Sequence, residues 1–325
     1  MIVDVEELRS LCQEILVERN MTDSDAHIVT DVLIEAELRG RATHGVIRMP
    51  AIADRVTTSA RKHMLLAKDG PASASVDGQE NLGYLVAHRC ARSVIGKADQ
   101  TGIGVVSGFN TGHCGMLGYY ASMIADAGLV GLVMCNTSPR VVPWGGIEPV
   151  LGTNPIAAGF PAPNGQVLID LSAAAITTGE ILVALKDGEE IPEGRALGPD
   201  GKMTTDPDVA RKGAVLPVGE HKGYALGMMV QLFSGVLTGA APVPKPGQNY
   251  GIFMVALSPA LFTEEEDFVS GVGEVVKRIK TSLHADGVEE ILVPGERAFR
   301  EREMRLQSGI GVDDDLMAVL RRLVA

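Results

Sequence analysis

The sequence predicts a mixed α/β fold with helices at its N-terminal end. Beyond residue 71, segments rich in β-branched residues alternate with segments whose apolar residues recur at helical spacing. Before residue 71, helical spacing dominates. Hydrophobic residues make up 46% of the chain and glycines number 38, which suits a packed α/β protein better than a disordered one.

The N-terminal region is expected to be helical as far as Gly40. One predicted helix begins near Asp4, and a second begins near Thr22, where "TDSD" offers capping side chains. A short helix is predicted at 43–56, capped by Thr43 and disturbed at Pro50.

The rest of the chain alternates between strands and helices. Strands are expected at 72–78, 101–109, 129–136, 152–161, 165–172 and 250–259. Helices are expected at 84–102, from about 115 to 127, at 262–283 and at 313–324. The polar segment 186–213 is expected to be an exposed loop, because Gly and Pro are frequent in it. The uncharged segment 224–244 is about as long as a membrane span, but polar residues and glycines interrupt it, which favours a buried central helix.

Composition and charge argue against several classes of partner. A net charge of −12 and only 4% aromatic residues disfavour binding to nucleic acid. The four cysteines form no C-x-x-C pair, so we expect neither a zinc site nor a disulfide framework. Free thiols, together with an N-terminus that lacks a signal-peptide pattern, favour a reducing cytoplasm.

The first candidate site is the pair His44 and Arg48 in "THGVIR". At a spacing of four residues, both side chains would share one face of the predicted helix. Arginine offers a planar fork for a carboxylate, and histidine offers a titratable proton. A 2-oxo or 2-hydroxy acid would use both, although a surface histidine beside a solvated arginine explains the spacing equally well.

The second candidate is His113 in "NTGHCGMLG", between a predicted strand and a predicted helix. The glycines around it do not match the G-x-G-x-x-G pattern of a Rossmann site. The positive end of the helix would favour a neutral imidazole, which can exchange a proton with a substrate oxygen. A histidine that caps the turn is the alternative. Lys222 is expected either to meet a bound anion or to extend along a helix start.

Taken in order, several stretches resemble the type 2 malate/L-lactate dehydrogenases. These are "THGVIRMP", "GHCGMLGYYASMIADAGLVG", "NTSPRVVPWGG", "LGTNPIAAGFP", "IDLSAAAITTGEI", "TTDP", "HKGYALGMMVQLFSGVLTG" and "VPGE". The family includes ureidoglycolate, sulfolactate and 2,3-diketogulonate oxidoreductases and reductases of cyclic imino acids. The stretches run from the second predicted helix nearly to the C-terminus, so the resemblance covers most of the chain.

The resemblance implies a non-Rossmann fold with two domains. A helical domain at 1–70, joined by C-terminal helices at 265–325, would accompany a mixed-sheet domain at 71–264 that binds cofactor and substrate. The implied activity is hydride transfer between NAD or NADP and C2 of a small 2-oxo/2-hydroxy acid. The implied assembly is a homodimer, and no metal is expected.

The resemblance also assigns roles to residues. The proton donor would be His44 or His113, with Thr43 beside them, and Arg48 would bind the substrate carboxylate. The cofactor contacts would be Ser138, Asp170, Leu171, Ser172, His221, Lys222, Gly295, Glu296 and Arg297.

Three residues depart from the family pattern. Thr43 stands where Ser is usual, Glu180 where Lys is expected, and Arg195 where Trp is common. Glu180 reverses a charge, which leaves the contacts to the cofactor phosphates and the choice between NAD and NADP open.

Three alternative functions remain open from the sequence. A reductase of cyclic 2-imino acids would use Arg48 in the same way, because its substrate also carries a carboxylate beside the reacting carbon. A metal-dependent hydrolase or lyase would use His44, His113 and Asp170, but no H-x-x-x-H or H-E-x-x-H spacing is present. A protein that binds the cofactor without catalysis is the third.

Overall fold

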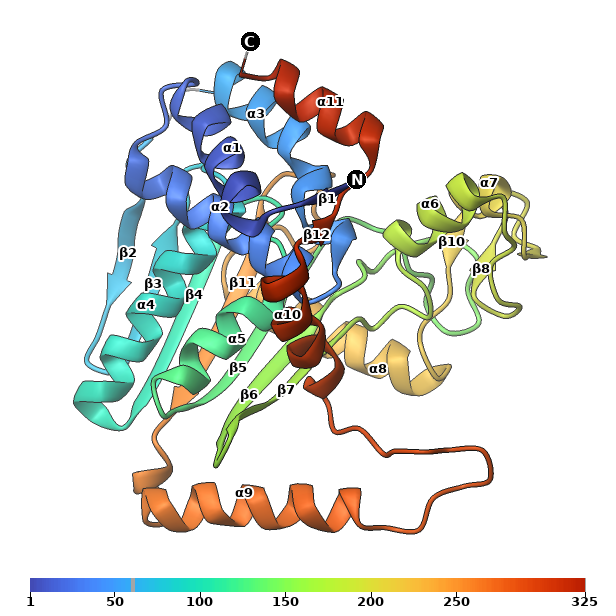
Figure 1. The fold of residues 1–325 in the computed structure, drawn as a ribbon. Helices are drawn as coiled ribbons and strands as arrows, with labels where there is room; N and C mark the ends of the chain where they lie inside the picture. The colour runs from blue at the N-terminus through green and yellow to red at the C-terminus, as the bar shows by residue number, and fades with distance from the viewer. Residues whose placement is uncertain (60–61, 325) are drawn as a thin grey trace.

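The computed structural model describes residues 1–59 and 62–324 and has the mixed α/β fold that the sequence predicts (Figure 1). Within these residues, a seven-stranded sheet has the order β2-β3-β4-β11-β5-β6-β7. β3 and β4 pair in parallel, and the other neighbouring strands pair antiparallel. The strands are β2 (Leu65–Asp69), β3 (Ser73–Asp77), β4 (Ile103–Thr111), β5 (Val130–Cys135), β6 (Ile156–Ala162), β7 (Gly165–Leu171) and β11 (Tyr250–Leu257).

A layer of helices covers one face of this sheet, and the alternation of side chains along β11 shows why. Ile252, Met254 and Ala256 are buried in the main core, while Phe253 points to the opposite face. The helices of the main layer are α1 (Val5–Val17), α2 (Asp23–Leu38), α3 (Met49–Thr58), α4 (Gly83–Thr101), α5 (Leu117–Asp126), α10 (Glu296–Ser308) and α11 (Asp314–Arg322).

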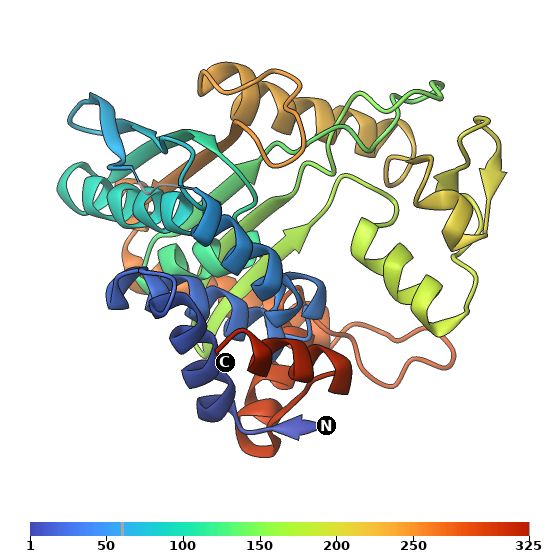
Figure 2. The same ribbon diagram turned by 90° about the horizontal axis from the view of Figure 1, so that it is seen from above.

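The two ends of the chain meet in this helical layer. β1 (Ile2–Val3) pairs antiparallel with β12 (Ile310–Gly311), and α11 packs against α1 and α3. Figure 2 shows the N-terminal strand beside the C-terminal helices. The cap predicted at Thr22 is confirmed, because its side chain accepts the N–H of Asp25.

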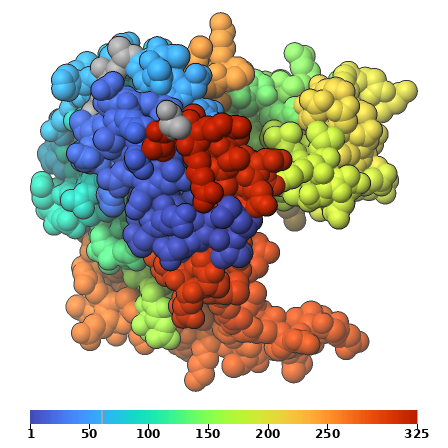
Figure 3. All heavy atoms as spheres, turned by 45° about the horizontal axis from the view of Figure 1, so that its top comes forward, coloured from blue at the N-terminus to red at the C-terminus, as the bar shows by residue number. Residues whose placement is uncertain are grey.

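Most residues of 186–213 are exposed or half-buried, as predicted, but the segment is not a plain loop because it contains short strands and a short helix. The segment contributes to a small lobe that stands beside the helical layer (Figure 3). The lobe has its own apolar core, in which Ile181, Ile191 and Val215 are buried. Its elements are α6 (Thr178–Asp187), β8 (Ala196–Leu197), β9 (Met203–Thr204), α7 (Pro207–Ala210) and β10 (Ala214–Val215). The strands are too short to produce a recognisable alternation in the sequence.

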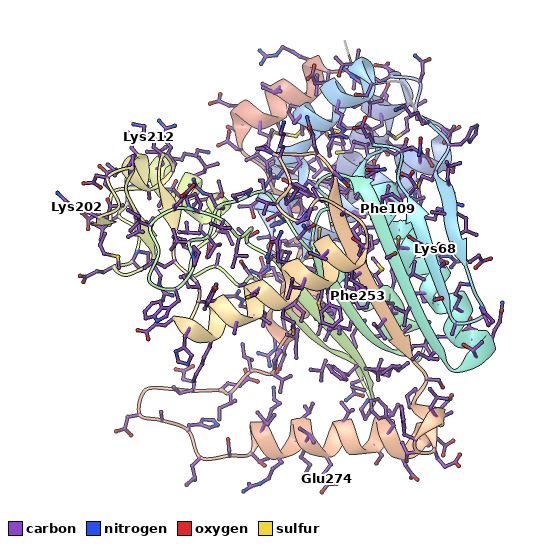
Figure 4. The ribbon with its side chains drawn as sticks, turned by 180° about the vertical axis from the view of Figure 1, so that it is seen from behind. Lys68, Phe109, Lys202, Lys212, Phe253 and Glu274 are labelled. Atoms are coloured by element: carbon purple, nitrogen blue, oxygen red, sulfur yellow. The ribbon has the colours of Figure 1, made fainter. Side chains whose placement is uncertain are left out.

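The prediction of a buried central helix at 224–244 is wrong. α8 (His221–Val230) continues into a π-helix, η3 (Gln231–Leu237), and together they cross the open face of the sheet beside Phe253 (Figure 4). Gly227, Gln231 and Ser234 face the protein together with Val230, which packs in a cluster with Phe253. Met228, Leu232 and Val236 face outward. Among the described residues, no helix combines the length and the hydropathy needed to span a membrane.

α9 (Glu265–Lys280) is amphipathic, as predicted, but none of its residues is buried. It lies below the main body in Figure 1 and continues into an extended segment that leads back to α10. An apolar cavity of about 550 Å³ between α9 and the β6–β7 edge is lined by Phe160, Phe268 and Val275.

Candidate active site

His44 and Arg48 do not share one helix, which corrects the sequence prediction. They lie on two successive 3-10 turns, η1 (Ala42–His44) and η2 (Val46–Arg48), which Gly45 separates. Thr43 caps no helix, and α3 begins only at Met49, with Pro50 in its first turn, where proline is tolerated.

A side-chain network nevertheless brings the predicted residues together. Nε of Arg48 donates to the carbonyl of Thr43 at 2.7 Å. The hydroxyl of Thr43 lies 3.1 Å from Nδ1 of His44. The ring of His44 stacks on that of His113, with centroids 5.5 Å apart and planes inclined by 27°. The structure thus places Thr43, His44, Arg48 and His113 in one cluster.

The contacts of His113 determine its tautomer. Nδ1 accepts the backbone N–H of Gly115 at 3.2 Å, and the hydroxyl of Tyr84 lies 3.3 Å from the same atom. Because Nδ1 is an acceptor, the proton of the neutral ring resides on Nε2. Sequence reasoning missed Tyr84, since a tyrosine in the first turn of a predicted helix carries no functional signal.

Both imidazoles are neutral at physiological pH. Burial lowers the pKa of His113 to about 3, and the charges of Arg48 and His44 act in the same direction. Burial lowers the pKa of His44 to about 4, assisted by Arg48 and Arg41. The neutral ring expected at His113 is therefore confirmed. Its main cause is desolvation rather than the dipole of α5, which begins four residues later.

The positive charge of Arg48 lies close enough to both histidines to lower the pKa of each. Within residues 1–59 and 62–324, no carboxylate forms an ion pair with its guanidinium. A partly buried arginine in this position favours a bound carboxylate, which would offset the cost of desolvating the cation. The cluster can therefore anchor a carboxylate and donate a proton to an oxygen nearby.

The glycines near His113 make room for protein atoms. A Cβ on Gly118 would lie 2.7 Å from Oδ2 of Asp170, and this oxygen accepts the N–H of Gly118 at 2.9 Å. A Cβ on Gly115, where φ is +82°, would lie 2.9 Å from Tyr84. Gly115 and Gly118 therefore accommodate neighbouring side chains of the protein. Burial raises the pKa of Asp170, although the contact to Gly118 opposes the shift.

The segment that follows β7 lies beside the segment that precedes α8. The hydroxyl of Ser172 donates to the carbonyl of Thr153 at 2.9 Å, and Leu171 is 40% exposed. The carbonyl of Ala173 accepts the N–H of Val218, so the segment before His221 lies beside Ser172.

The N-terminus of α8 fits a phosphate group. No side chain caps it, and its N-cap residue Glu220 has a φ of +59°. His221 and Lys222 are exposed in its first turn. Unsatisfied backbone N–H groups and a nearby cation are what an anion at a helix N-terminus requires. The residues present therefore fit the diphosphate of a dinucleotide.

The other expected cofactor residues lie in different surroundings. Ser138 accepts a hydrogen bond from the hydroxyl of Tyr250 at 3.1 Å. Gly295, with a φ of +89°, packs closely on Leu168 of β7. Glu296 pairs with Lys280 and with Arg300, both at 2.5 Å. Arg297 is exposed one residue further on.

Glu180 has a structural role that explains its departure from the family pattern. Its Oε2 accepts the N–H and the hydroxyl of Thr177, and the Thr177 hydroxyl in turn accepts the N–H of Glu180. This reciprocal capping box begins α6. Gly179 lies against Thr43, and a Cβ there would be 2.4 Å from its methyl group. Arg195, also near this turn, lines a cavity of about 500 Å³ with Thr43 and Glu180.

The described residues contain no group of three or more His, Cys, Asp or Glu side chains arranged to hold a metal ion. The cysteines Cys12, Cys90, Cys114 and Cys135 are buried and unpaired. The cluster of Thr43, His44, Arg48 and His113 has the groups needed to hold a carboxylate and to exchange a proton, a combination typical of an oxidoreductase acting on small acids.

Comparison with known proteins agrees with this class. The family model described as malate/L-lactate dehydrogenase matches residues 3–321. The malate/(S)-sulfolactate dehydrogenase of Methanothermus fervidus is 36% identical over 99% of this chain and 97% of its own length. The Δ1-pyrroline-2-carboxylate reductase of Ancylobacter novellus is 32% identical over 98% of this chain and 96% of its own.

The fold agrees as well. The solved structure of the sulfolactate dehydrogenase of Methanocaldococcus jannaschii superposes with a TM-score of 0.93 at 34% identity, covering 99% of this chain and 96% of that one. The chain belongs to the malate/L-lactate dehydrogenase family and is an oxidoreductase.

Proposed function

We propose that the chain transfers a hydride reversibly between a nicotinamide cofactor and C2 of a small 2-oxo/2-hydroxy acid. The observation that carries this proposal is the Arg48 guanidinium, which lies close to two neutral imidazoles and has no carboxylate partner among the described residues. A 2-oxo acid places its carboxylate and its reactive carbonyl on adjacent carbons. One end would therefore bind Arg48 while the other lies near the histidines.

In the direction of reduction, His113 is proposed as the proton donor. Its Nε2 carries the proton of the neutral ring and can release it to the alkoxide that forms at C2. His44 stacks on His113, and its hydrogen bond to Thr43 restrains the orientation of its ring. The nicotinamide supplies the hydride when it is bound, and the protein holds the carbonyl and its proton in place.

We propose that the cofactor diphosphate binds at the start of α8, beside His221 and Lys222. The absence of a side-chain cap at the start of α8 and the exposed cation of Lys222 in its first turn support this placement. The remaining contacts would come from Ser138, from Asp170, Leu171 and Ser172, and from Gly295, Glu296 and Arg297. Removing the cation with Lys222→Ala is expected to raise the KM for the cofactor about tenfold.

The test of the reaction is oxidation of NADH and NADPH at 340 nm against 2-oxo acids and cyclic 2-imino acids. Turnover on 2-oxo acids, lost by 10²- to 10⁴-fold in His113→Ala, supports the proposal. Turnover on cyclic imines alone would favour the second candidate function, a reductase of cyclic 2-imino acids. The similarity to a pyrroline-2-carboxylate reductase is the observation that supports this candidate. Full activity in His113→Ala would contradict the proposed donor, and a matching loss in His44→Ala would transfer that role to His44.

We further propose that the protein is a cytoplasmic homodimer formed through α8 and η3. Met228, Leu232, Val236 and Leu237 face outward and are 46%, 48%, 53% and 63% exposed. Copies that each carry a charge of −12 repel one another, so they meet most favourably on the uncharged segment 224–244.

The orientation of this helix is fixed from its inner side. Nδ2 of Asn154 donates to the carbonyl of Gly227 and to Oε1 of Gln231, both at 2.7 Å. The apolar face therefore cannot turn inward without breaking buried hydrogen bonds. Light scattering is expected to give twice the chain mass of 34.3 kDa, and Leu232→Glu is expected to give a monomer. A monomeric wild type would contradict the proposal.

The division of the chain into a helical domain at 1–70 with 265–325, and a cofactor- and substrate-binding domain at 71–264, is also a proposal. The packing of α10 against α2, and of α11 against α1, supports the inclusion of the C-terminal helices.

A further inference from the structure

Glu37 is a buried carboxyl group beneath the His44–Arg48 segment, and the proposed chemistry does not use it. It lies in the last turn of α2, and 3% of its surface is exposed. Its Oε1 accepts the backbone N–H of Val46 at 2.8 Å. From the other side, Nη1 of Arg305 on α10 donates to the backbone carbonyl of Glu37 at 2.5 Å. Glu37 is thus held in the helical layer while its side chain reaches the catalytic segment.

The contact depends on a glycine between the two 3-10 turns. An ideal Cβ on Gly45 would lie 2.0 Å from Oε1 of Glu37, so a side chain at this position would displace the carboxyl group from its contact with Val46. Gly45 therefore lets the carboxyl group reach Val46, the first residue of the turn that carries Arg48. The same hydrogen bond fixes where that turn begins relative to the turn that ends at His44.

We propose that Glu37 is a positioning residue, whose contact with Val46 across Gly45 sets the Arg48 guanidinium relative to the His44–His113 pair. The inference rests on the proposed function. A 2-oxo acid has its carboxylate and carbonyl on adjacent carbons, so the anchor and the proton donor must keep a fixed separation. A misplacement of about 1 Å in such an arrangement lowers the rate by about 10²-fold.

The ionisation of Glu37 offers a direct readout of the contact. Burial raises the pKa of Glu37 to about 7, opposed by the Val46 N–H and by the charge of Arg305. The groups that face it are Arg305 from α10 and the thiol of Cys12 from α1, and burial raises the pKa of Cys12 to about 12. Cys12 therefore stays protonated while Glu37 changes charge near neutral pH.

The test compares Glu37→Leu, which removes the acceptor, with Glu37→Gln, which keeps an amide oxygen in its place. The control is Glu35→Gln, because Glu35 is also buried on α2 but pairs with Arg39 and Arg302 instead of the catalytic segment. Glu37→Leu is expected to lower kcat/KM for a 2-oxo acid by about 10- to 100-fold relative to the control at a similar Tm. Glu37→Gln is expected to stay within about threefold of wild type.

Two further measurements do not depend on turnover. The amide resonance of Val46 is expected to titrate near pH 7 in the wild type and not in Glu37→Gln. Oxamate, an unreactive analogue of a 2-oxo acid, is expected to bind Glu37→Leu more weakly than the control. The inference is overturned if Glu37→Leu and Glu35→Gln lose activity and oxamate affinity equally, or if the Val46 amide does not titrate. A wild type that turns over neither acids nor imines overturns the proposed function, and the oxamate and amide measurements then decide the positioning role alone.

Discussion

The half-buried pair of His44 and His113 is expected to make the fold sensitive to acid, and His113→Gln tests this. The pKa of His113 falls from 6.5 to about 3 on folding, mainly because burial disfavours the charged ring. The unfolded chain therefore binds a proton between these values that the folded chain does not. The stabilisation is fully present above pH 6.5 and is lost as the pH falls toward 3.

The size of the effect follows from the shift. Each unit of pKa difference corresponds to about 1.4 kcal/mol, so the wild type is expected to lose about 3 kcal/mol from His113 alone between pH 7.5 and 4.5. Glutamine keeps a polar side chain of similar reach but takes up no proton. The free energy of unfolding of His113→Gln, relative to wild type, is therefore expected to rise by about 3 kcal/mol over this interval.

The assay is urea unfolding followed by circular dichroism at both pH values and at one fixed protein concentration. His284→Gln serves as the control, because His284 is an exposed histidine far along the chain. It is expected to follow the wild-type pH dependence. The reasoning is refuted if His113→Gln and wild type lose stability equally on acidification.

Three other substitutions test neighbouring contacts. Tyr84→Phe removes the hydroxyl near Nδ1 of His113 and is expected to lower kcat/KM about fivefold at unchanged cofactor KM. An unchanged kcat/KM would contradict a role for this hydroxyl. Gly118→Ala places a Cβ against the carboxylate of Asp170 and is expected to lower the free energy of unfolding in urea by about 1–3 kcal/mol. Wild-type stability would show that the Asp170 side chain moves aside without loss. Glu180→Ala removes half of a capping box and is expected to increase the rate of amide exchange in the first turn of α6 about fivefold. An unchanged exchange rate would show that the capping box does not stabilise this turn.

The sequence predicted the main sheet well, because its strands and flanking helices carry strong periodic patterns. β4, α4 and β5 lie within two residues of the predicted ranges. The small lobe was missed because strands of two residues have no measurable alternation. α8 and η3 were misjudged because an uncharged helix looks the same in sequence whether its apolar side faces a core or the solvent.

The sequence did not predict the geometry by which the chain brings the candidate residues together. His44, Arg48 and His113 belong to one cluster, yet the spacing of His44 and Arg48 indicated a continuous helix. Gly45 interrupts that helix with a ψ of −148°, and the carboxyl group of Glu37 occupies the space that a side chain at Gly45 would need. Such a tertiary contact joins residues on two elements, so local spacing alone could not reveal it.

The pairing of β1 with β12 has a consequence for the order of events during synthesis. These strands lie about 300 residues apart, and α11 covers α1 on the same side of the molecule. At the usual pace of translation, the partners of the first strand and helix emerge roughly 15 to 60 s later. During that interval, α1 lacks its contacts with α11, and β1 lacks its pairing with β12. The helical layer around α1 is therefore complete only after β12 and α11 have been synthesised.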